Sequence, residues 1–365
     1  MAGRSHLLVV PVSGASGEMA IGLRLAWQLH AAGDRALFLT PKNHFARLEG
    51  TPFPHGSIDG LLGELPGILP MIVAERRADD IILVDLTSAL LTCAIYNLDV
   101  RFLGRQKVPV LALDLWSLAE TSLILDAAGD EIALSRAGLD LVPRRMVVAP
   151  YARPDAPGAC DFWPARGGTV DRAAARASWA DGAERLVVLV TALWQQHALM
   201  ATPAMAGVPA RLAAVLAALP DGLLVVHVGP RPLSGHETLG ARYRHVPPLS
   251  DAEFRRLLAA ADVLVTLNQL PTSAGVALDL EVPVVAVTGR NPRFRVWPGG
   301  FNRFFGEVLA QNPFGALVRS VALEDADELR DALWQPRLDR TALAAYRAQI
   351  AALPRATDRL DGWLA

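Results

Sequence analysis

The sequence predicts an α/β fold built from two doubly wound domains with parallel sheets. Short apolar runs alternate along the chain with longer stretches of helical periodicity, which is typical of parallel strands that are buried on both faces and joined by crossover helices. The alternation occurs twice, before and after a proline-rich segment. A chain of 365 residues, 52% of them hydrophobic, is long enough for two such domains, each with its own core.

The first domain is expected at residues 1–150. Its most clearly predicted helix is Glu18–Ala32, because Leu25 and Leu29 belong to an apolar stripe and Gly33 supplies a C-terminal stop. The strands predicted for this domain are Leu7–Val12, Arg35–Leu39, Asp80–Asp85, Val108–Asp114 and Arg145–Ala149.

A linker is expected at residues 151–170, because Pro150–Pro164 holds four prolines in fifteen residues and proline disfavours both continuous helix and central strand. The second domain then spans 171–340, and helices in 341–365 are expected to cross back to the first domain. The predicted strands are Arg185–Thr191, Leu223–Val228, Tyr243–His245, Val263–Thr266 and Val282–Val287, and the helices are Asp171–Trp179, Pro209–Leu219, Asp251–Ala260, Ser273–Leu280, Thr341–Leu353 and Asp358–Leu364.

Composition excludes several classes of function. The formal charge is -2, from 35 basic and 37 acidic residues, which provides no overall electrostatic attraction for nucleic acid or an anionic membrane. Only Cys93 and Cys160 occur, and neither a signal peptide nor a run long enough to span a membrane is visible, so a cytoplasmic location is expected. The histidines lack metal-ligand spacing, so no metal site is predicted.

A glycine-containing turn lies between the first strand and the first helix, in the segment Val12–Met19. Gly14 and Gly17 allow the backbone to turn sharply and approach a ligand, while the helix N-terminus presents free N–H groups to an anion. The spacing is not the G-x-G-x-x-G of dinucleotide-binding folds. A tight turn without a ligand is the alternative.

Three segments of the second domain resemble the donor-binding domain of GT-B glycosyltransferases. They are Tyr243–Leu249 with its Val-Pro pair, Leu257–Thr266 with its Ala-Ala-Asp-Val run, and Ala277–Val285. The Gly14–Gly17 turn with its long helix, followed by Gly33–Pro41, is similar to the opening of the acceptor domain of that superfamily. The resemblance implies two Rossmann-like domains that face a central cleft, with nucleotide-sugar in the second domain and acceptor in the first.

The sequence departs from that superfamily where the donor diphosphate is expected. The usual histidine and glycines after the strand are replaced by Leu267–Ser273. The diphosphate is then expected on the N-terminus of the next helix, with Thr272 and Ser273 as hydroxyl donors, because such a site depends mainly on backbone N–H groups. Arg290 lies in an arginine-rich segment and is a further candidate, with a solvated loop as the alternative.

The nucleotide base is expected near four other residues. Val246 and Pro247 form the Val-Pro pair of the resemblance. Trp194 is a candidate for stacking on a base or sugar, and Gln195 for a polar contact to phosphate or acceptor. A packed interdomain tryptophan is the alternative for Trp194.

Acceptor activation needs a general base, for which the sequence offers three carboxylates. Glu18 opens the first helix, where many related transferases place a histidine, and Asp85 and Asp114 each end a strand at the edge where open α/β sheets bind ligands. A first-turn stabiliser is the alternative for Glu18. A helix cap or a loop hydrogen bond is the alternative for the two aspartates.

The resemblance implies a metal-independent glycosyltransferase with no tightly bound cofactor. Its co-substrate would be a UDP-, TDP- or GDP-sugar, and its acceptor a small molecule or a peptide, with the hydrophobic loop Leu61–Ile72 as a possible acceptor surface. Two alternatives remain: a nucleotide-sugar epimerase or hydrolase on the same fold, and a non-catalytic partner-binding protein. Sugar, acceptor, stereochemical outcome and oligomeric state are not indicated by the sequence.

Overall fold

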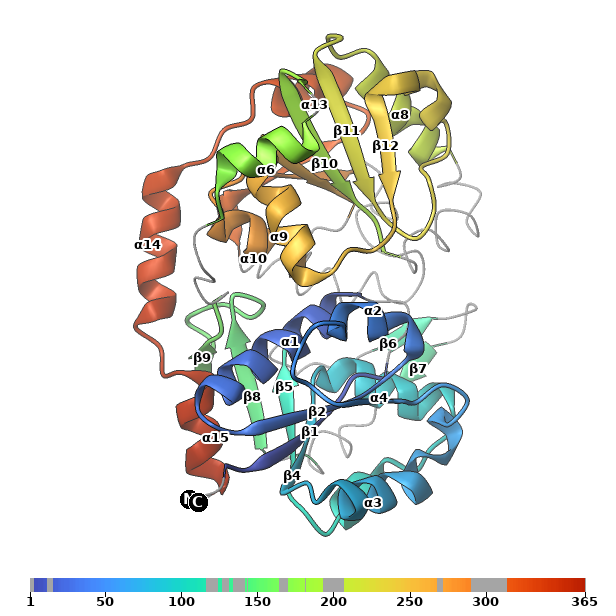
Figure 1. Cartoon of the computed structure of the whole chain (residues 1–365), viewed down its shortest axis with the longest axis vertical. Coiled ribbons are helices and arrows are strands. Elements are labelled where there is room, and N and C mark those ends of the chain that lie inside the picture. The colour runs from blue at the N-terminus through green and yellow to red at the C-terminus, as the bar shows by residue number, and fades with distance from the viewer. Residues whose placement is uncertain are drawn as a thin grey trace. The chain divides into compact units, whose positions relative to one another are not determined.

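The computed structural model describes residues 3–11, 16–115, 124–126, 131–133, 142, 144–163, 170–180, 182–192, 207–267, 272–289 and 314–364. The chain forms two compact units (Figure 1). Unit 1 consists of Met1–Ala165 together with Arg347–Ala365, and unit 2 consists of Arg166–Tyr346. Each unit contains one parallel sheet with helices beside it.

The sheet of unit 1 has the strand order β3-β2-β1-β4-β5-β8-β9, and every pairing within it is parallel. The order reverses between β1 and β4, which makes this pair the topological switch point of the sheet. A separate antiparallel hairpin pairs β6 with β7. The strands are β1 Ser5–Val9, β2 Arg35–Thr40, β3 His55–Ser57, β4 Asp80–Leu83, β5 Val110–Asp114, β6 Ile124–Asp126, β7 Glu131–Ala133, β8 Arg144–Ala149 and β9 Ala159–Asp161.

Helix α1 illustrates how local sequence and packing agree in unit 1. It ends at Ala31, and Gly33 follows with a φ of 91°, a left-handed conformation that glycine adopts without strain. A Cβ on Gly22 would lie 3.1 Å from a ring carbon of Phe38, so this glycine lets the helix pack closely on the sheet. The helices of unit 1 are α1 Ser16–Ala31, α2 Phe45–Leu48, α3 Leu65–Arg76, α4 Leu86–Ile95 and α15 Ala356–Leu364.

The core of unit 1 combines residues from both ends of the chain. Leu8 of β1 and Ile82 of β4 are fully buried in one cluster with Leu25 of α1. Ala356 and Leu360 of α15 belong to the same cluster. Helix α15 is therefore part of this hydrophobic core rather than a surface appendage.

The sheet of unit 2 has the order β12-β11-β10-β13-β14-β15 and is parallel throughout. Its order reverses between β10 and β13. All six residues of β11 are buried, as expected for a strand that is covered on both faces. The strands are β10 Arg185–Val190, β11 Leu223–Val228, β12 Tyr243–Val246, β13 Val263–Thr266, β14 Val284–Thr288 and β15 Val318–Ala322.

Two helices of unit 2 begin at side-chain caps. The carboxylate of Asp171 accepts hydrogen bonds from two backbone N–H groups of α6, and Ser250 and Glu253 form a capping box at α9. Helix α14 contains the point at which the chain passes from unit 2 to unit 1. The helices are α6 Arg172–Trp179, α8 Val208–Ala217, α9 Asp251–Ala260, α10 Thr272–Asp279, α13 Ala326–Trp334 and α14 Arg340–Ala351.

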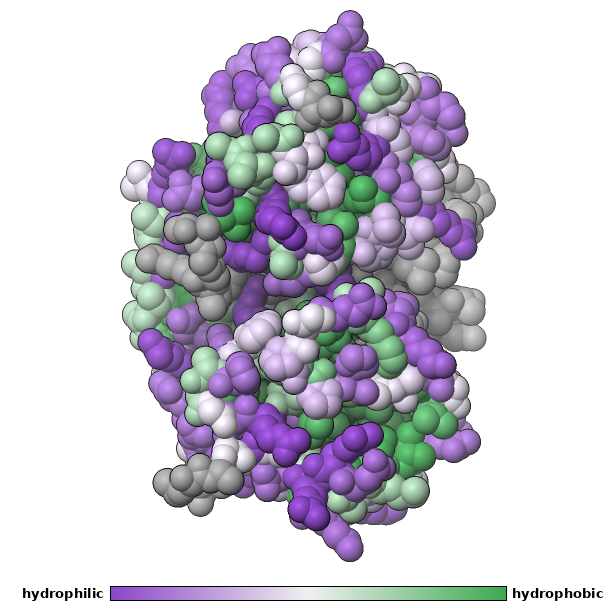
Figure 2. All heavy atoms as spheres, in the orientation of Figure 1, coloured by the Kyte–Doolittle hydropathy of each residue, from purple (hydrophilic) through white to green (hydrophobic). Residues whose placement is uncertain are grey.

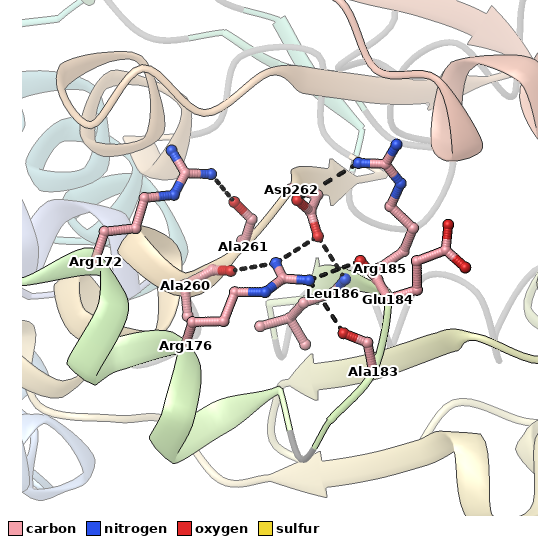
Figure 3. Close-up of polar contacts among 9 residues, drawn as sticks. All are labelled: Arg172, Arg176, Ala183, Glu184, Arg185, Leu186, Ala260, Ala261 and Asp262. Carbon is pink, nitrogen blue, oxygen red and sulfur yellow. Dashed lines mark hydrogen bonds and ion pairs between the residues drawn. The ribbon is translucent and has the colours of Figure 1, made fainter.

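A polar cluster around Arg176 joins α6 to the amino ends of β10 and β13 (Figure 3). The Arg176 guanidinium donates to Asp262 Oδ2 at 2.6 Å and to the carbonyl oxygen of Ala260 at 3.1 Å. It also donates to the carbonyl oxygens of Ala183 and Glu184, at 3.2 and 2.7 Å. One planar side chain thus satisfies three backbone carbonyls and a carboxylate from separate segments.

The predicted fold class of two parallel-sheet α/β domains is confirmed. Strand β9 lies inside the segment for which the prolines predict a linker, because its residues Ala159–Asp161 include none of these prolines and can pair with β8. Residues 61–72, expected as a hydrophobic loop, instead form a 3-10 turn and most of α3. Leu65, Leu69 and Val73 are buried at helical spacing there.

Apolar side chains reach the surface of unit 1 in the region of α3 and α4, as the visible face in Figure 2 shows. Met71 of α3 is 69% exposed, and Tyr96, which follows α4, is 47% exposed. Among the described residues, no helix is long and apolar enough to cross a membrane.

Candidate active site

Three acidic residues lie at the carboxyl edge of the sheet in unit 1. Glu18 is in the first turn of α1, which follows β1, Asp85 follows β4, and Asp114 ends β5. Because β1, β4 and β5 are adjacent and parallel, the three residues come to one edge, at the switch point. The sequence predicts where each of the three residues lies along the chain. Only the order of the strands in the sheet brings them to the same place.

Ser88 connects two of these carboxylates. Its hydroxyl lies 2.6 Å from Asp85 Oδ2 and 3.3 Å from Glu18 Oε1. Asp85 also accepts a hydrogen bond from the backbone N–H of Thr87 at 3.0 Å, so it caps α4, as its alternative interpretation predicts. Within the described part of the chain, Glu18 Oε2 is buried and has no hydrogen-bond partner.

Burial dominates the electrostatics of this cluster. It raises the pKa of Glu18 to about 8, and the charge of Asp85 adds to the rise. Burial also raises the pKa of Asp85 to about 6, although hydrogen bonds from Ser88 and Thr87 oppose the rise and the charge of Asp114 adds to it. At neutral pH the pair therefore holds one proton, on Glu18, while Asp85 is ionised. A carboxyl group with a pKa near the working pH is suited to general acid–base chemistry.

The candidate donor residues of unit 2 also lie at the carboxyl edge of their sheet. Thr272 and Ser273 occupy the first turn of α10, beyond β13, and both are half-buried. Val246 ends β12, and its carbonyl oxygen accepts a hydrogen bond from the N–H of Gly229 at 3.2 Å. Pro247, the next residue, is exposed. The helix N-terminus and the Val-Pro pair thus belong to one edge of unit 2.

A buried hydrogen-bonded chain supports this edge between β10, β11 and β12. The backbone N–H of Leu233 donates to the Tyr243 hydroxyl at 2.8 Å, so the Tyr243 proton is directed to His227 Nδ1, 2.6 Å away. His227 Nε2 then donates to Thr191 Oγ1 at 2.8 Å. Burial, followed by the charges of His245 and His236, lowers the pKa of His227 to about 3, so the ring remains neutral.

Gly229 makes this chain sterically possible. A Cβ at this position would overlap Thr191 Oγ1 and lie 2.9 Å from His227 Nε2. We expect Gly229→Ala to lower the free energy of unfolding by ~2 kcal/mol in urea titrations, because a tightly packed site must shift. Gly207→Ala is the matched control, since no atom lies within 4 Å of its Cβ position. Equal stability of the two variants would contradict the prediction.

The remaining predicted residues have mixed outcomes. Gly17 is in the first turn of α1. Gly14, Trp194, Gln195 and Arg290 lie outside the described residues, and their roles stay predictions. Among the described residues, no group of three or more His, Cys, Asp or Glu side chains could hold a metal ion.

The family model that matches the sequence is that of a family of unknown function, DUF6365, over residues 25–292. The chain belongs to this family. No curated protein matches the sequence. Solved structures, in contrast, match over the full length of the chain and identify the fold.

The similar structures are glycosyltransferases at low sequence identity. The glycosyltransferase SnogD from Streptomyces nogalater has a TM-score of 0.60 at 15% identity, and the spinosyn forosaminyltransferase SpnP a TM-score of 0.57 at 14%, each with full coverage of both chains. The spinosyn rhamnosyltransferase SpnG has a TM-score of 0.57 at 16% identity, over 99% of this chain and all of that one. SpnG has also been solved with thymidine diphosphate and with spinosyn aglycone. This DUF6365 member therefore has the GT-B fold, as the resemblance implies.

Two sets of residues in this DUF6365 member were not among the predicted site residues. Ser88 had only an indirect local signal, because Asp85 before an apolar run is typical of a helix N-terminus and Ser88 falls in the first turn of that helix. The chain from Tyr243 through His227 to Thr191 had none, since its members come from three strands that only the sheet brings together.

Proposed function

We propose that this protein is a GT-B-type glycosyltransferase. It transfers a sugar from a UDP-, TDP- or GDP-sugar to a small-molecule or peptide acceptor, without a metal ion. Unit 2 binds the donor at the carboxyl edge of its sheet, and unit 1 binds the acceptor at the edge that carries Glu18. The single observation that supports this most strongly is the joining of Glu18 and Asp85 through Ser88 at the switch point of unit 1.

Glu18 is the proposed general base. When its carboxylate is ionised, it accepts the proton of the acceptor hydroxyl while the acceptor oxygen forms a bond to the anomeric carbon of the sugar. The bond from that carbon to the diphosphate oxygen breaks in the same step. A base with a pKa of about 8 is strong enough to assist this proton transfer and is still partly ionised near neutral pH.

The leaving diphosphate is proposed to bind at the first turn of α10. The N-terminal N–H groups of a helix stabilise developing negative charge, and the hydroxyl groups of Thr272 and Ser273 add donors. The names of the similar structures support a sugar donor of this kind, because SpnP and SpnG are named for sugar transfer and SpnG was solved with thymidine diphosphate. Asp279, at the end of α10, pairs with Arg255 at 3.0 Å and is not proposed as a donor contact.

The deciding experiment is to incubate the protein with a panel of UDP-, TDP- and GDP-sugars, with and without a library of acceptors, and to measure released nucleoside diphosphate and glycosylated product. A transferase releases the diphosphate and forms product only with an acceptor. Turnover of a donor without any acceptor would instead support an epimerase or a hydrolase. No turnover and no calorimetric binding of any nucleotide would contradict the proposal.

The donor site can be tested before the acceptor is known. We expect the best nucleoside diphosphate of the panel to raise the thermal midpoint, because a ligand that binds only the native state stabilises it by about 2.7 kcal/mol at 100 times its Kd. Ser273→Ala should weaken that binding roughly five-fold, equivalent to about one hydrogen bond of 1 kcal/mol. Ser178→Ala, on the outside of α6, is the control, and unchanged affinity in both variants would refute this placement.

A further inference from the structure

The hydroxyl of Ser88 lies between two carboxyl groups from different elements. Asp85, at the start of α4, is only 3% exposed, and Glu18 comes from the first turn of α1. The two are separated by more than 60 positions in the sequence, and Ser88 contacts both. A serine whose only role was to cap a helix would bond to a backbone N–H group and would not need to contact two carboxyl groups.

The proton of this hydroxyl can be placed by counting donors. Ser88 has one hydrogen to donate, and the 2.6 Å distance to Asp85 Oδ2, against 3.3 Å to Glu18 Oε1, assigns it to Asp85. A lone pair of the Ser88 oxygen then faces Glu18. Protonated Glu18 can donate to that lone pair, so the three groups form one directed chain from Glu18 through Ser88 to Asp85.

We propose that Ser88 is a positioning residue that makes Glu18 and Asp85 a single proton-sharing unit. When the proton of Glu18 passes to the Ser88 oxygen, the hydroxyl hydrogen of Ser88 passes to Asp85, and Ser88 is neutral before and after. This movement returns Glu18 to its ionised form and leaves the proton on Asp85, which releases it before the next turnover. The inference deepens the proposed function, because it states how the general base of that reaction is held and reset.

The charges around the unit agree with this arrangement. The groups that act on it are Glu18 from α1, Asp85 at α4 and Asp114 from β5, all acidic. Their mutual repulsion disfavours ionisation of all of them together. The Ser88 hydroxyl stabilises whichever of the two carboxylates it donates to, and it lowers the pKa of that group.

The test measures the titration of Glu18 and needs no activity. The free energy of unfolding is measured against pH for the wild type, Glu18→Gln, Ser88→Ala and the double variant. The difference between wild type and Glu18→Gln isolates the titration of Glu18 with Ser88 present, and the difference between Ser88→Ala and the double variant isolates it without Ser88. We expect the apparent pKa of Glu18 to fall by about one pH unit in the Ser88→Ala background, since protonated Glu18 loses the oxygen to which it donates. Ser88→Thr, which keeps the hydroxyl, should restore the wild-type value.

Thr92→Ala is the matched control, because Thr92 is a buried residue of the same helix whose hydroxyl donates to the Ser88 carbonyl oxygen rather than to a carboxylate. It should lower stability without moving the titration of Glu18. If Ser88→Ala does not fold, Ser88→Cys provides the same measurement with a weak donor of similar size. An unchanged Glu18 titration in the serine variant would overturn the inference, whereas a shifted titration in a protein without transferase activity would refute only the proposed function.

Discussion

Glu18→Gln will stabilise the protein at alkaline pH. The folded-state pKa of Glu18 is about 8, above its ordinary value of 4.5, so between these pH values the native state binds more protons than the unfolded chain. The free energy of unfolding of the wild type must therefore fall as pH rises from about 4.5 to about 8. Glutamine has no ionised form, so the variant lacks this loss, which we expect to amount to ~5 kcal/mol at pH 9.

Urea unfolding at pH 5, 7 and 9 provides the measurement. The curves for wild type and variant should converge at pH 5 and separate as the pH rises. Glu49→Gln, an exposed glutamate after α2, is the control and should run parallel to the wild type. Parallel curves for Glu18→Gln as well would show that Glu18 is not protonated in the native state at neutral pH.

The same substitution should remove the proposed transferase activity. Glutamine cannot accept the acceptor proton, and loss of a general base costs about 10²- to 10⁴-fold in rate. In the wild type, kcat/KM should rise with pH through an apparent pKa near 8, the value of the coupled pair rather than of one residue. Binding of the nucleoside diphosphate in unit 2 should be unchanged, which separates a chemical defect from a folding defect.

Arg176→Met will destabilise the protein far more than the loss of a neighbouring arginine of the same helix. Methionine keeps the apolar stem but removes the guanidinium. The carbonyl oxygens of Ala183 and Glu184 then lose this donor, and Asp262 loses its ion pair with Arg176 while it keeps the N–H of Leu186 and the more distant Arg185 (Figure 3). The Arg176 and Asp262 side chains are 29% and 16% exposed, so water compensates only in part. We expect a loss of ~3 kcal/mol in the free energy of unfolding.

Arg172→Met is the matched control for this prediction. Arg172 lies one turn earlier on the same helix, is exposed, and donates to one carbonyl oxygen, that of Ala261. Its replacement should cost at most ~1 kcal/mol. Arg176→Lys should recover little of the stability, because an ammonium group cannot reach several acceptors in one plane. Similar losses for the two methionine variants would contradict a special role of Arg176.

Local sequence patterns were sufficient to predict the segments whose structure depends on their own residues. The apolar run of β11 predicts a strand that is buried on both faces, and the stripe of α1 with Gly33 after it predicts the helix and its end. These patterns were insufficient where pairing or packing with distant residues decides whether a strand or helix forms. Strand β9 forms in the proline-rich segment because its three residues, none of them proline, pair with β8. Helix α3 forms despite Pro70 because Leu65, Leu69 and Val73 pack inward.

The candidate site also combines features that the local sequence determines with features that only the tertiary structure decides. By itself the sequence determined that Glu18 would open the first helix and that Asp85 and Asp114 would each stand where a strand ends, because strand ends and helix starts follow from local patterns. Only the tertiary structure decided that β1, β4 and β5 are neighbours, that Ser88 joins two of the carboxyl groups, and that the pKa of Glu18 rises. The physical reason is that desolvation and charge repulsion depend on distances through space, between residues that the order of the chain leaves far apart.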